Sequence, residues 1–186
     1  MNLKKVLAEK KTDIIGKWYQ SILNDYPEKT AAVYKNSLNQ FANPVGATIS
    51  GAVTKLFDEF VIGFEEERVK PIIEEIVRIR AIQNFSPSKS LEFIFRFKGI
   101  ILKFIEKDIQ SENIKELLKI EAEIDRLAQI SFDIYVAYRE KLFELKANEF
   151  KSKVHMLLKK ADPNYKEHIV NPFSQRKKDK KSDHIS

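Results

Sequence analysis

Apolar side chains recur every three or four residues along most of the chain, which is the spacing of one face of an α-helix. No segment shows the two-residue alternation typical of a half-buried strand. Five glycines and six prolines interrupt the pattern only occasionally. The segments with helical periodicity cover residues 3–23, 28 to about 38, 44 to about 62, 66–83, 87 to about 107 and 111–162. The pattern therefore predicts an all-α fold with a long C-terminal helix.

Two of the predicted helices have clear start signals. Asn43 precedes Pro44, and Ser86 precedes Pro87. An Asn or Ser side chain can accept a hydrogen bond from a free backbone N–H of the first turn. Proline suits the first helical position because its missing N–H would have no partner there. We therefore expect helices to begin at both prolines, and the first of them to end near Gly63.

The last predicted helix carries an apolar seam with steps of three or four residues. The seam consists of Leu117, Ile120, Ile124, Leu127, Ser131, Ile134, Tyr138, Leu142 and Leu145. Such a seam can face a partner helix. Residues 127–138 are apolar on almost every side, which predicts burial all round. We expect the helix to serve the core at its start and a dimer interface further on, with Ile134, Tyr138, Leu142 and Leu145 as candidate dimer residues.

Two polar residues fall on the apolar register of the segment 66–83. Arg80 and Gln83 continue the steps set by Val69, Ile73 and Ile76. A buried arginine needs a carboxylate or carbonyl partner, because burial of an isolated charge is very costly. The candidate partners are Asp133 and Asp125. Two interpretations remain open: a structural ion pair that locks helices together, or a small polar cavity that binds a ligand or switches helix packing.

In this chain of 186 residues, composition and charge indicate one soluble domain followed by a basic tail. The net charge is +6, and residues 161–186 contribute six Lys or Arg against four Asp or Glu. We predict a folded domain over 1–160 and a disordered tail over 161–186. The basic residues of the tail are Arg176, Lys177, Lys178, Lys180 and Lys181. Because the positive excess is dispersed, nucleic-acid binding is disfavoured, although a tail-mediated regulator remains an alternative.

Catalytic and metal chemistry lacks the residues it requires. Cysteine is absent, and the three histidines are His155, His168 and His184. A proximal histidine for haem is therefore missing from the first 154 residues, and no Glu-x-x-His motif suggests a di-iron bundle. Nucleophile elbows and phosphate-binding loops are also missing from the sequence. We predict a protein that is not an enzyme and has no cofactor, with a redox or haem protein using an unusual ligand as an alternative.

The location prediction follows from the same composition. The N-terminal residues lack the apolar core of a secretory signal, and no uncharged run is apolar enough to span a bilayer. We expect a cytoplasmic protein without a membrane segment.

Three blocks of the sequence resemble, in order, the RsbRD N-terminal domain family of RsbR-type stressosome co-antagonists. The blocks are FANPVGATISGAVTKLFDEF, EEIVRIRAIQNFSPSKSLEFIF and EIDRLAQISFDIYVAYREKLFELKANE. The resemblance implies a globin-like but haem-free helical bundle that dimerises and serves as a sensory module of stress signalling. In that family the last helix leads into a STAS domain, which needs on the order of 100 residues. The segment after residue 160 is too short for one, so we expect a stand-alone form.

Overall fold

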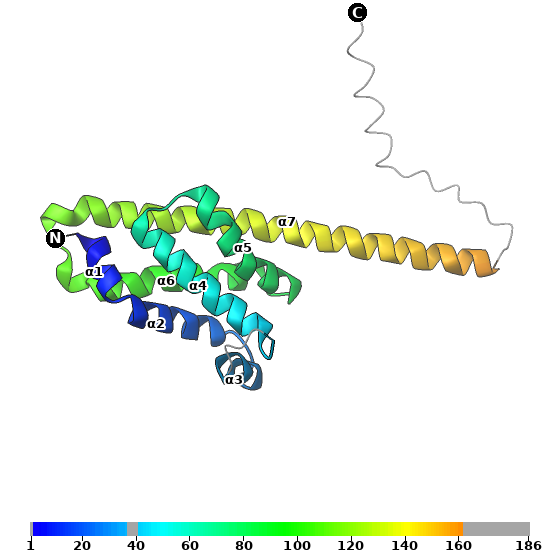
Figure 1. Ribbon diagram of the computed structural model, residues 1–186. Coiled ribbons are helices and arrows are strands. Elements are labelled where there is room, and N and C mark those ends of the chain that lie inside the picture. Colours follow the sequence, from blue (N-terminus) through cyan, green and yellow to red (C-terminus); the bar gives the residue numbers. More distant parts are fainter. Residues whose placement is uncertain (1, 37–40, 162–186) are drawn as a thin grey trace, which may run out of the picture. The chain divides into compact units, whose positions relative to one another are not determined.

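The computed structural model describes residues 2–36 and 41–161, and helices account for nearly all of them (Figure 1). The elements are α1 (Leu3–Glu9), α2 (Lys11–Leu23), α3 (Glu28–Asn36), α4 (Pro44–Ile62), α5 (Glu66–Ile82), α6 (Pro87–Ile105), the 3-10 turns η1 (Glu106–Asp108) and η2 (Ser111–Asn113), and α7 (Ile114–Ala161). No strand occurs in the described residues. The predicted all-α class and the long C-terminal helix are confirmed.

The chain divides into two units, residues 1–142 and residues 143–186. In the first unit, α2 packs against α4 and α6, and α4 packs against α5. Trp18 of α2 lies at the centre of this core. Its ring stacks on Phe97 with centroids 3.9 Å apart, and its Nε1 donates to the Phe93 carbonyl oxygen at 2.9 Å. A buried Trp thus keeps its one donor satisfied, as buried indoles usually do.

Both predicted helix starts are confirmed. The Asn43 side chain accepts from the Gly46 N–H at 2.9 Å, with Pro44 as the first residue of α4. The Ser86 side chain accepts from the Lys89 N–H, with Pro87 as the first residue of α6. Gly46 is required by close approach, because a Cβ there would lie 2.7 Å from the carbonyl oxygen of Tyr34.

The first predicted helix is instead two helices, since α1 and α2 meet at Lys10, whose φ of −101° and ψ of 15° are not helical. Tertiary contacts at the start of α1 and at Lys10 itself accompany the break. The Glu116 carboxylate accepts from the first N–H groups of α1, at 2.9 Å from Leu3 and 3.1 Å from Lys4. The Lys10 ammonium donates to the Phe104 carbonyl oxygen near the end of α6 at 2.7 Å. These contacts hold the start of α1 against α7 and the junction of α1 and α2 against the end of α6.

Within the first unit, α7 buries one face and exposes the other. The buried residues are Ile120, Glu123, Ile124, Leu127, Ile130, Ser131, Ile134 and Tyr135. Phe132 and Asp133 lie between them in sequence and are exposed. The prediction that residues 127–138 are buried all round was therefore wrong. The bundle covers this helix from one side only, so an apolar residue on the outer face stays accessible.

The second unit is described from residue 143 to residue 161, all within α7. Most of its side chains are exposed, including several large apolar ones. These are Phe143, Leu145, Phe150, Met156, Leu157 and Leu158. Over the described residues of the chain, no helix has the length and apolar character needed to cross a membrane.

Candidate functional site

The most unusual polar feature of the first unit is a buried carboxylate in the turn between α2 and α3. Asp25 follows Asn24, the C-terminal cap of α2, and its backbone N–H donates to the Ile22 carbonyl oxygen at 3.2 Å. This last turn directs the side chain inward, where only 2% of it is exposed. Buried carboxylates require charged or hydrogen-bonding partners. Asp25 has three cationic ones.

Arg80, in the last turn of α5, is the most deeply buried of these partners. It is 0% exposed, and its Nη2 donates to Asp25 Oδ2 and to the Lys89 carbonyl oxygen, both at 2.6 Å. Its guanidinium carbon lies 4.6 Å from the ring centroid of Phe85 and 5.5 Å from that of Phe93. Flat guanidinium groups stack favourably on aromatic rings. Within residues 2–36 and 41–161, however, its Nε and Nη1 are buried and have no hydrogen-bond partner.

The other two cations come from α6. Arg96 Nη2 lies 2.7 Å from both Asp25 oxygens, and its Nη1 donates to the Ser21 carbonyl oxygen. Lys89 Nζ lies 2.8 Å from Asp25 Oδ1 and 3.0 Å from Glu92 Oε2. One carboxylate therefore connects the α2–α3 turn to the end of α5 and the first half of α6. We call Asp25, Arg80, Lys89 and Arg96 the Asp25 cluster.

The pKa shifts of Asp25 and Lys89 favour the charged forms of both groups. Burial alone raises the pKa of the Asp25 carboxyl, but hydrogen bonds from Lys89, Arg80 and Arg96 outweigh burial and leave that pKa below its ordinary value. The hydrogen bond to Asp25, with a second one to Glu92, raises the pKa of the Lys89 ammonium. Both shifts favour the charged pair. A pH change near neutrality would therefore leave these two groups charged.

Tyr26 extends the cluster toward the surface. Burial raises the pKa of its phenol to about 12, so the hydroxyl remains a donor, and it donates to Gln83 Oε1 at 2.9 Å. Its ring makes edge contacts with Tyr34, at a centroid distance of 5.1 Å, and with Phe85, at 5.4 Å. Rearrangement at the α2–α3 turn would therefore move an aromatic group shared by α3 and the α5–α6 junction.

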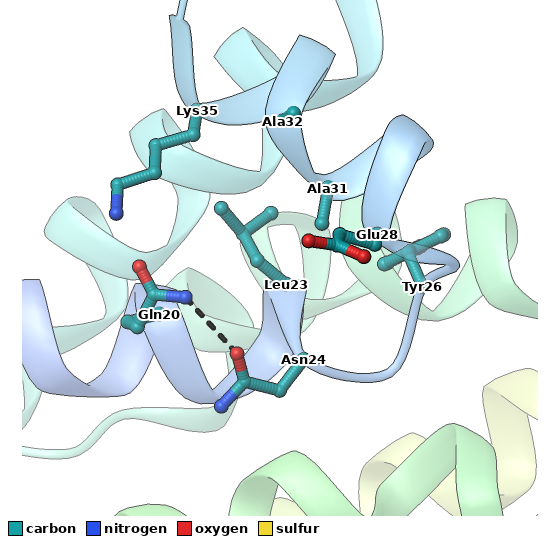
Figure 2. Close-up of a pocket in the computed structure, with 8 residues that line it drawn as sticks. All are labelled: Gln20, Leu23, Asn24, Tyr26, Glu28, Ala31, Ala32 and Lys35. Atoms are coloured by element: carbon teal, nitrogen blue, oxygen red, sulfur yellow. Dashed lines mark hydrogen bonds between the residues drawn. The ribbon is translucent and has the colours of Figure 1, made fainter.

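An open groove of about 450 Å³ lies beside Tyr26, between the end of α2 and α3 (Figure 2). Its apolar part is formed by Leu23, Ala31 and Ala32. Its polar residues are Gln20, Asn24, Glu28 and Lys35, and Figure 2 shows the hydrogen bond of 3.0 Å between Gln20 and Asn24. Asp25 lies between two lining residues in sequence. A molecule in the groove would thus contact the same turn that carries the buried carboxylate.

The structure brings only part of the predicted polar site together. Arg80 is buried as expected, but it pairs with Asp25 and not with Asp125 or Asp133. Both of those aspartates are exposed on α7, and Asp125 lies 3.4 Å from Lys98 Nζ. Helical spacing placed Arg80 on the inward face of its helix but did not indicate which element would supply its carboxylate partner. The choice of partner is corrected accordingly.

Gln83 and Asp25 show two further limits of the sequence interpretation. Gln83 is exposed, because α5 ends at Ile82 and the helical register stops there. Its side chain still reaches the cluster through Tyr26. Asp25 lies in the sequence NDYP, just after the predicted segment 3–23, where apolar periodicity gives no indication of burial. The one available signal was an acidic residue in a turn next to an aromatic one.

The four candidate dimer residues of α7 lie in different surroundings. Ile134 is buried in the core of its own chain, and Tyr138 is half-buried and donates to Glu74 Oε1 at 2.7 Å. Leu142 is half-buried and Leu145 is exposed. The described chain thus already uses the first two for its own packing, and Leu142 and Leu145 stay available to a partner.

The other predictions from the sequence are the basic tail and the absence of a metal site. Arg176, Lys177, Lys178, Lys180 and Lys181 lie outside the described residues. In the part of the chain that the structure describes, no group of three or more His, Cys, Asp or Glu side chains is arranged to hold a metal ion.

Comparison with known families places the chain. A family model described as the RsbT co-antagonist protein rsbRD N-terminal domain matches residues 12–149. No curated protein and no solved structure matches the chain. Because the family match covers well over half of the sequence, the chain belongs to the RsbRD N-terminal domain family. This agrees with the resemblance seen in the three sequence blocks.

Proposed function

We propose that this member of the RsbRD N-terminal domain family is a non-catalytic, haem-free module that senses a signal and transmits it to a protein partner in cytoplasmic stress signalling. The observation that carries the proposal is the Asp25 cluster, in which one buried carboxylate joins three helices beside an open groove. A structural ion pair alone does not require an open groove at the same turn. The combination suits a site where an external event changes helix packing.

The change in helix packing would depend on Arg80, because only one of its three guanidinium nitrogens has hydrogen-bond partners in the described part of the chain. Its Nη2 donates two hydrogen bonds, whereas the other two guanidinium nitrogens, Nε and Nη1, lack hydrogen-bond partners among the described residues. A buried guanidinium in this state has donors that a different packing could satisfy. A signal that moves the α2–α3 turn would shift the balance between two packings, provided that they differ by only a few kcal/mol. The altered ends of α5 and α6 would then be sensed by α7, since the Tyr135 hydroxyl donates to the Phe85 carbonyl oxygen at 2.7 Å.

The single tryptophan offers a direct test of this mechanism. Trp18 lies at the α2–α6 contact, so its emission reports on that packing. We expect Asp25→Asn to shift the Trp18 emission and increase amide exchange in α5 and α6, while far-UV circular dichroism stays helical. A matched control is Asp58→Asn, which removes an exposed partner of Lys11. A folded Asp25→Asn protein with unchanged emission and unchanged exchange would contradict the switch.

We further propose a homodimer through Leu142 and Leu145, the accessible end of the predicted seam. Light scattering at tens of micromolar should give the mass of a dimer. Replacement of both leucines by Glu should give a monomer, because two charges would face each other at the interface. Replacement of exposed Phe132 by Glu is the control. A monomeric wild-type protein at this concentration would refute the dimer and leave the switch to be tested separately.

The haem-free proposal rests on the positions of the histidines, which all follow residue 154. Titration with haemin should give no stoichiometric endpoint in the Soret band. A defined endpoint would support the alternative of a haem protein with an unusual ligand, and it would overturn this part of the proposal.

A further inference from the structure

The C-terminal stretch of α7 contains a seven-residue repeat that the functions above do not use. Phe143, Phe150 and Leu157 are spaced by seven, and each is followed four residues later by a small or medium apolar residue. Those residues are Ala147, Val154 and Ala161. Alternating steps of four and three are the register of a coiled-coil seam. We call these six residues the heptad stripe.

The heptad stripe is accessible in the described chain. Phe150 is 69% exposed and Leu157 is 66% exposed, so the two largest side chains in its centre and C-terminal part lie mostly in solvent. Leu145 does not belong to this surface. At about 100° per residue, it lies roughly on the opposite side of the helix from the stripe. The stripe is therefore distinct from the surface proposed for the dimer.

Lysines border the stripe with the same period. Lys146, Lys153 and Lys160 are spaced by seven along one edge, and Lys151 lies on the other edge. Residues 143–161 contain five lysines and two glutamates. Among the described residues, Lys153 pairs with Glu149 at 2.6 Å, and no ion pair involves Lys146, Lys151 or Lys160. The first edge is thus positively charged beside an apolar centre, whereas the second edge combines Lys151 with Glu144 and Leu158, which lie seven residues before and after it.

This charge pattern disfavours a second copy as the occupant. In a parallel coiled coil, each g position lies opposite the e position five residues later in the other helix. In the heptad stripe, Lys146 is a g position and Lys151 is an e position. Lys146 would then face Lys151 of a second copy. In an antiparallel pair, the lysine-bearing edges would face each other. Like charges at these positions select against self-pairing and favour partners with acidic residues there.

The narrow stripe also suits a helix better than a lipid surface. An interfacial membrane helix presents a broad apolar face, whereas a seam of two positions in seven matches a single partner helix. From the seven-residue period, the exposure and the lysine edges together, we propose that the heptad stripe is a docking surface for an acidic amphipathic helix of another protein. This surface is independent of the switch and of the dimer, so either can fail without affecting it.

The test uses two synthetic helical peptides about three heptads long. Both carry Leu at the seam positions, with Glu at the flanking positions in one peptide and Lys in the other. We expect the full chain to bind the acidic peptide at least about tenfold more tightly than the basic one, with an affinity that falls as salt is added. Equal binding of the two peptides, or binding of neither, would overturn the proposal.

Two sets of variants separate the apolar and the charged contributions. Phe150→Ser with Leu157→Ser should abolish binding of the acidic peptide, whereas Leu145→Ser on the other side of the helix should leave it unchanged. Retained binding in the double variant would overturn the stripe as the docking surface. Far-UV circular dichroism of each variant checks that the helix is intact.

Charge reversal provides the sharper test. The triple variant Lys146→Glu, Lys153→Glu and Lys160→Glu should prefer the basic peptide, because the flanking charges are exchanged. An unchanged preference would overturn the charge argument.

Two further measurements test the other occupants. Binding to phosphatidylserine vesicles without binding to either peptide would assign the surface to a membrane and overturn the proposal. Self-association that is lost in the Phe150→Ser and Leu157→Ser protein but kept in Leu145→Ser would assign the surface to a second copy, with the same consequence.

Discussion

The Asp25 cluster and the C-terminal stretch of α7 both combine basic side chains with aromatic ones, yet they are arranged for opposite purposes. Arg80 is fully buried beside Phe85 and Phe93 and bonds to a carboxylate of its own chain. The lysines near Phe150 border an exposed stripe. The Asp25 carboxylate bonds to three basic groups from other elements and so holds helices together. Along the stripe the one recorded ion pair, Lys153 with Glu149, stays within a single helix, and Lys146, Lys151 and Lys160 make none among the described residues.

The largest expected effect is the loss of the buried pair. Arg80→Met should lower the free energy of unfolding by about 3–5 kcal/mol, because it leaves the Asp25 carboxylate buried with one partner fewer. Urea denaturation gives the value. The matched control is Lys151→Met, which we expect to change stability by less than about 0.5 kcal/mol. If both variants changed the free energy of unfolding by a similarly small amount, the buried pair would contribute no more to stability than an exposed lysine.

A second test compares two apolar residues of the same helix. Leu127→Ala should cost about 2–5 kcal/mol, because the buried side chain leaves a cavity in the core. Phe150→Ala removes a larger but exposed side chain and should cost less than about 0.5 kcal/mol. Thermal or urea unfolding of the two variants measures this difference. A comparable loss for Phe150→Ala would show that the second unit is packed in solution.

The pH dependence of stability sharpens the contrast further. The pKa of Asp25 is lower in the folded protein than in the unfolded chain, so its contribution is present above the unfolded pKa of about 4 and disappears as the pH falls through the folded value. Stability should therefore decrease below about pH 4, and Asp25→Asn should weaken this dependence while lowering stability at neutral pH. Urea unfolding from pH 3 to 7 would test both expectations. An identical pH profile in the variant would show that Asp25 is not responsible.

The smallest effect concerns the surface end of the cluster. Tyr26→Phe removes the hydroxyl that donates to Gln83 and should cost about 0.5–1.5 kcal/mol, the usual net value of one such bond. Gln83→Ala should cost a similar amount. The double variant should cost less than the sum of the two single ones, because they share one hydrogen bond. Strict additivity would show that the two residues do not interact in solution.

Most of the fold could be predicted because its signals are local. A capping Asn or Ser followed by proline acts within one helical turn, and the starts of α4 and α6 were found in that way. Apolar spacing likewise identified the inner face of α5, including Arg80. The break at Lys10 has no glycine or proline to signal it, and the contacts that accompany it come from Glu116 and Phe104, roughly a hundred positions away.

Of the candidate site, the sequence predicted the buried Arg80 but not its partner, because that partner lies in another element. An arginine on an apolar face indicates that a buried carboxylate or carbonyl partner must exist. The sequence contains 27 acidic residues, however, and does not indicate which of them is that partner. Asp133 lies within the apolar stretch 127–138 and Asp125 lies just before it, yet α7 exposes the side that carries both. Asp25 stood in a turn, where no periodicity indicates burial.

The sequence by itself determined the all-α class, the helix starts, the family and the heptad stripe, because each depends on residues only a few positions apart or on a pattern shared with relatives. The tertiary structure alone decided that Asp25 is the centre of the polar cluster, since residues 25, 80, 89 and 96 meet only after three helices have packed. It also decided which side of α7 is covered. Charge pairing across helices depends on distances that the packed helices set, and these distances are not encoded in the spacing along any one of them.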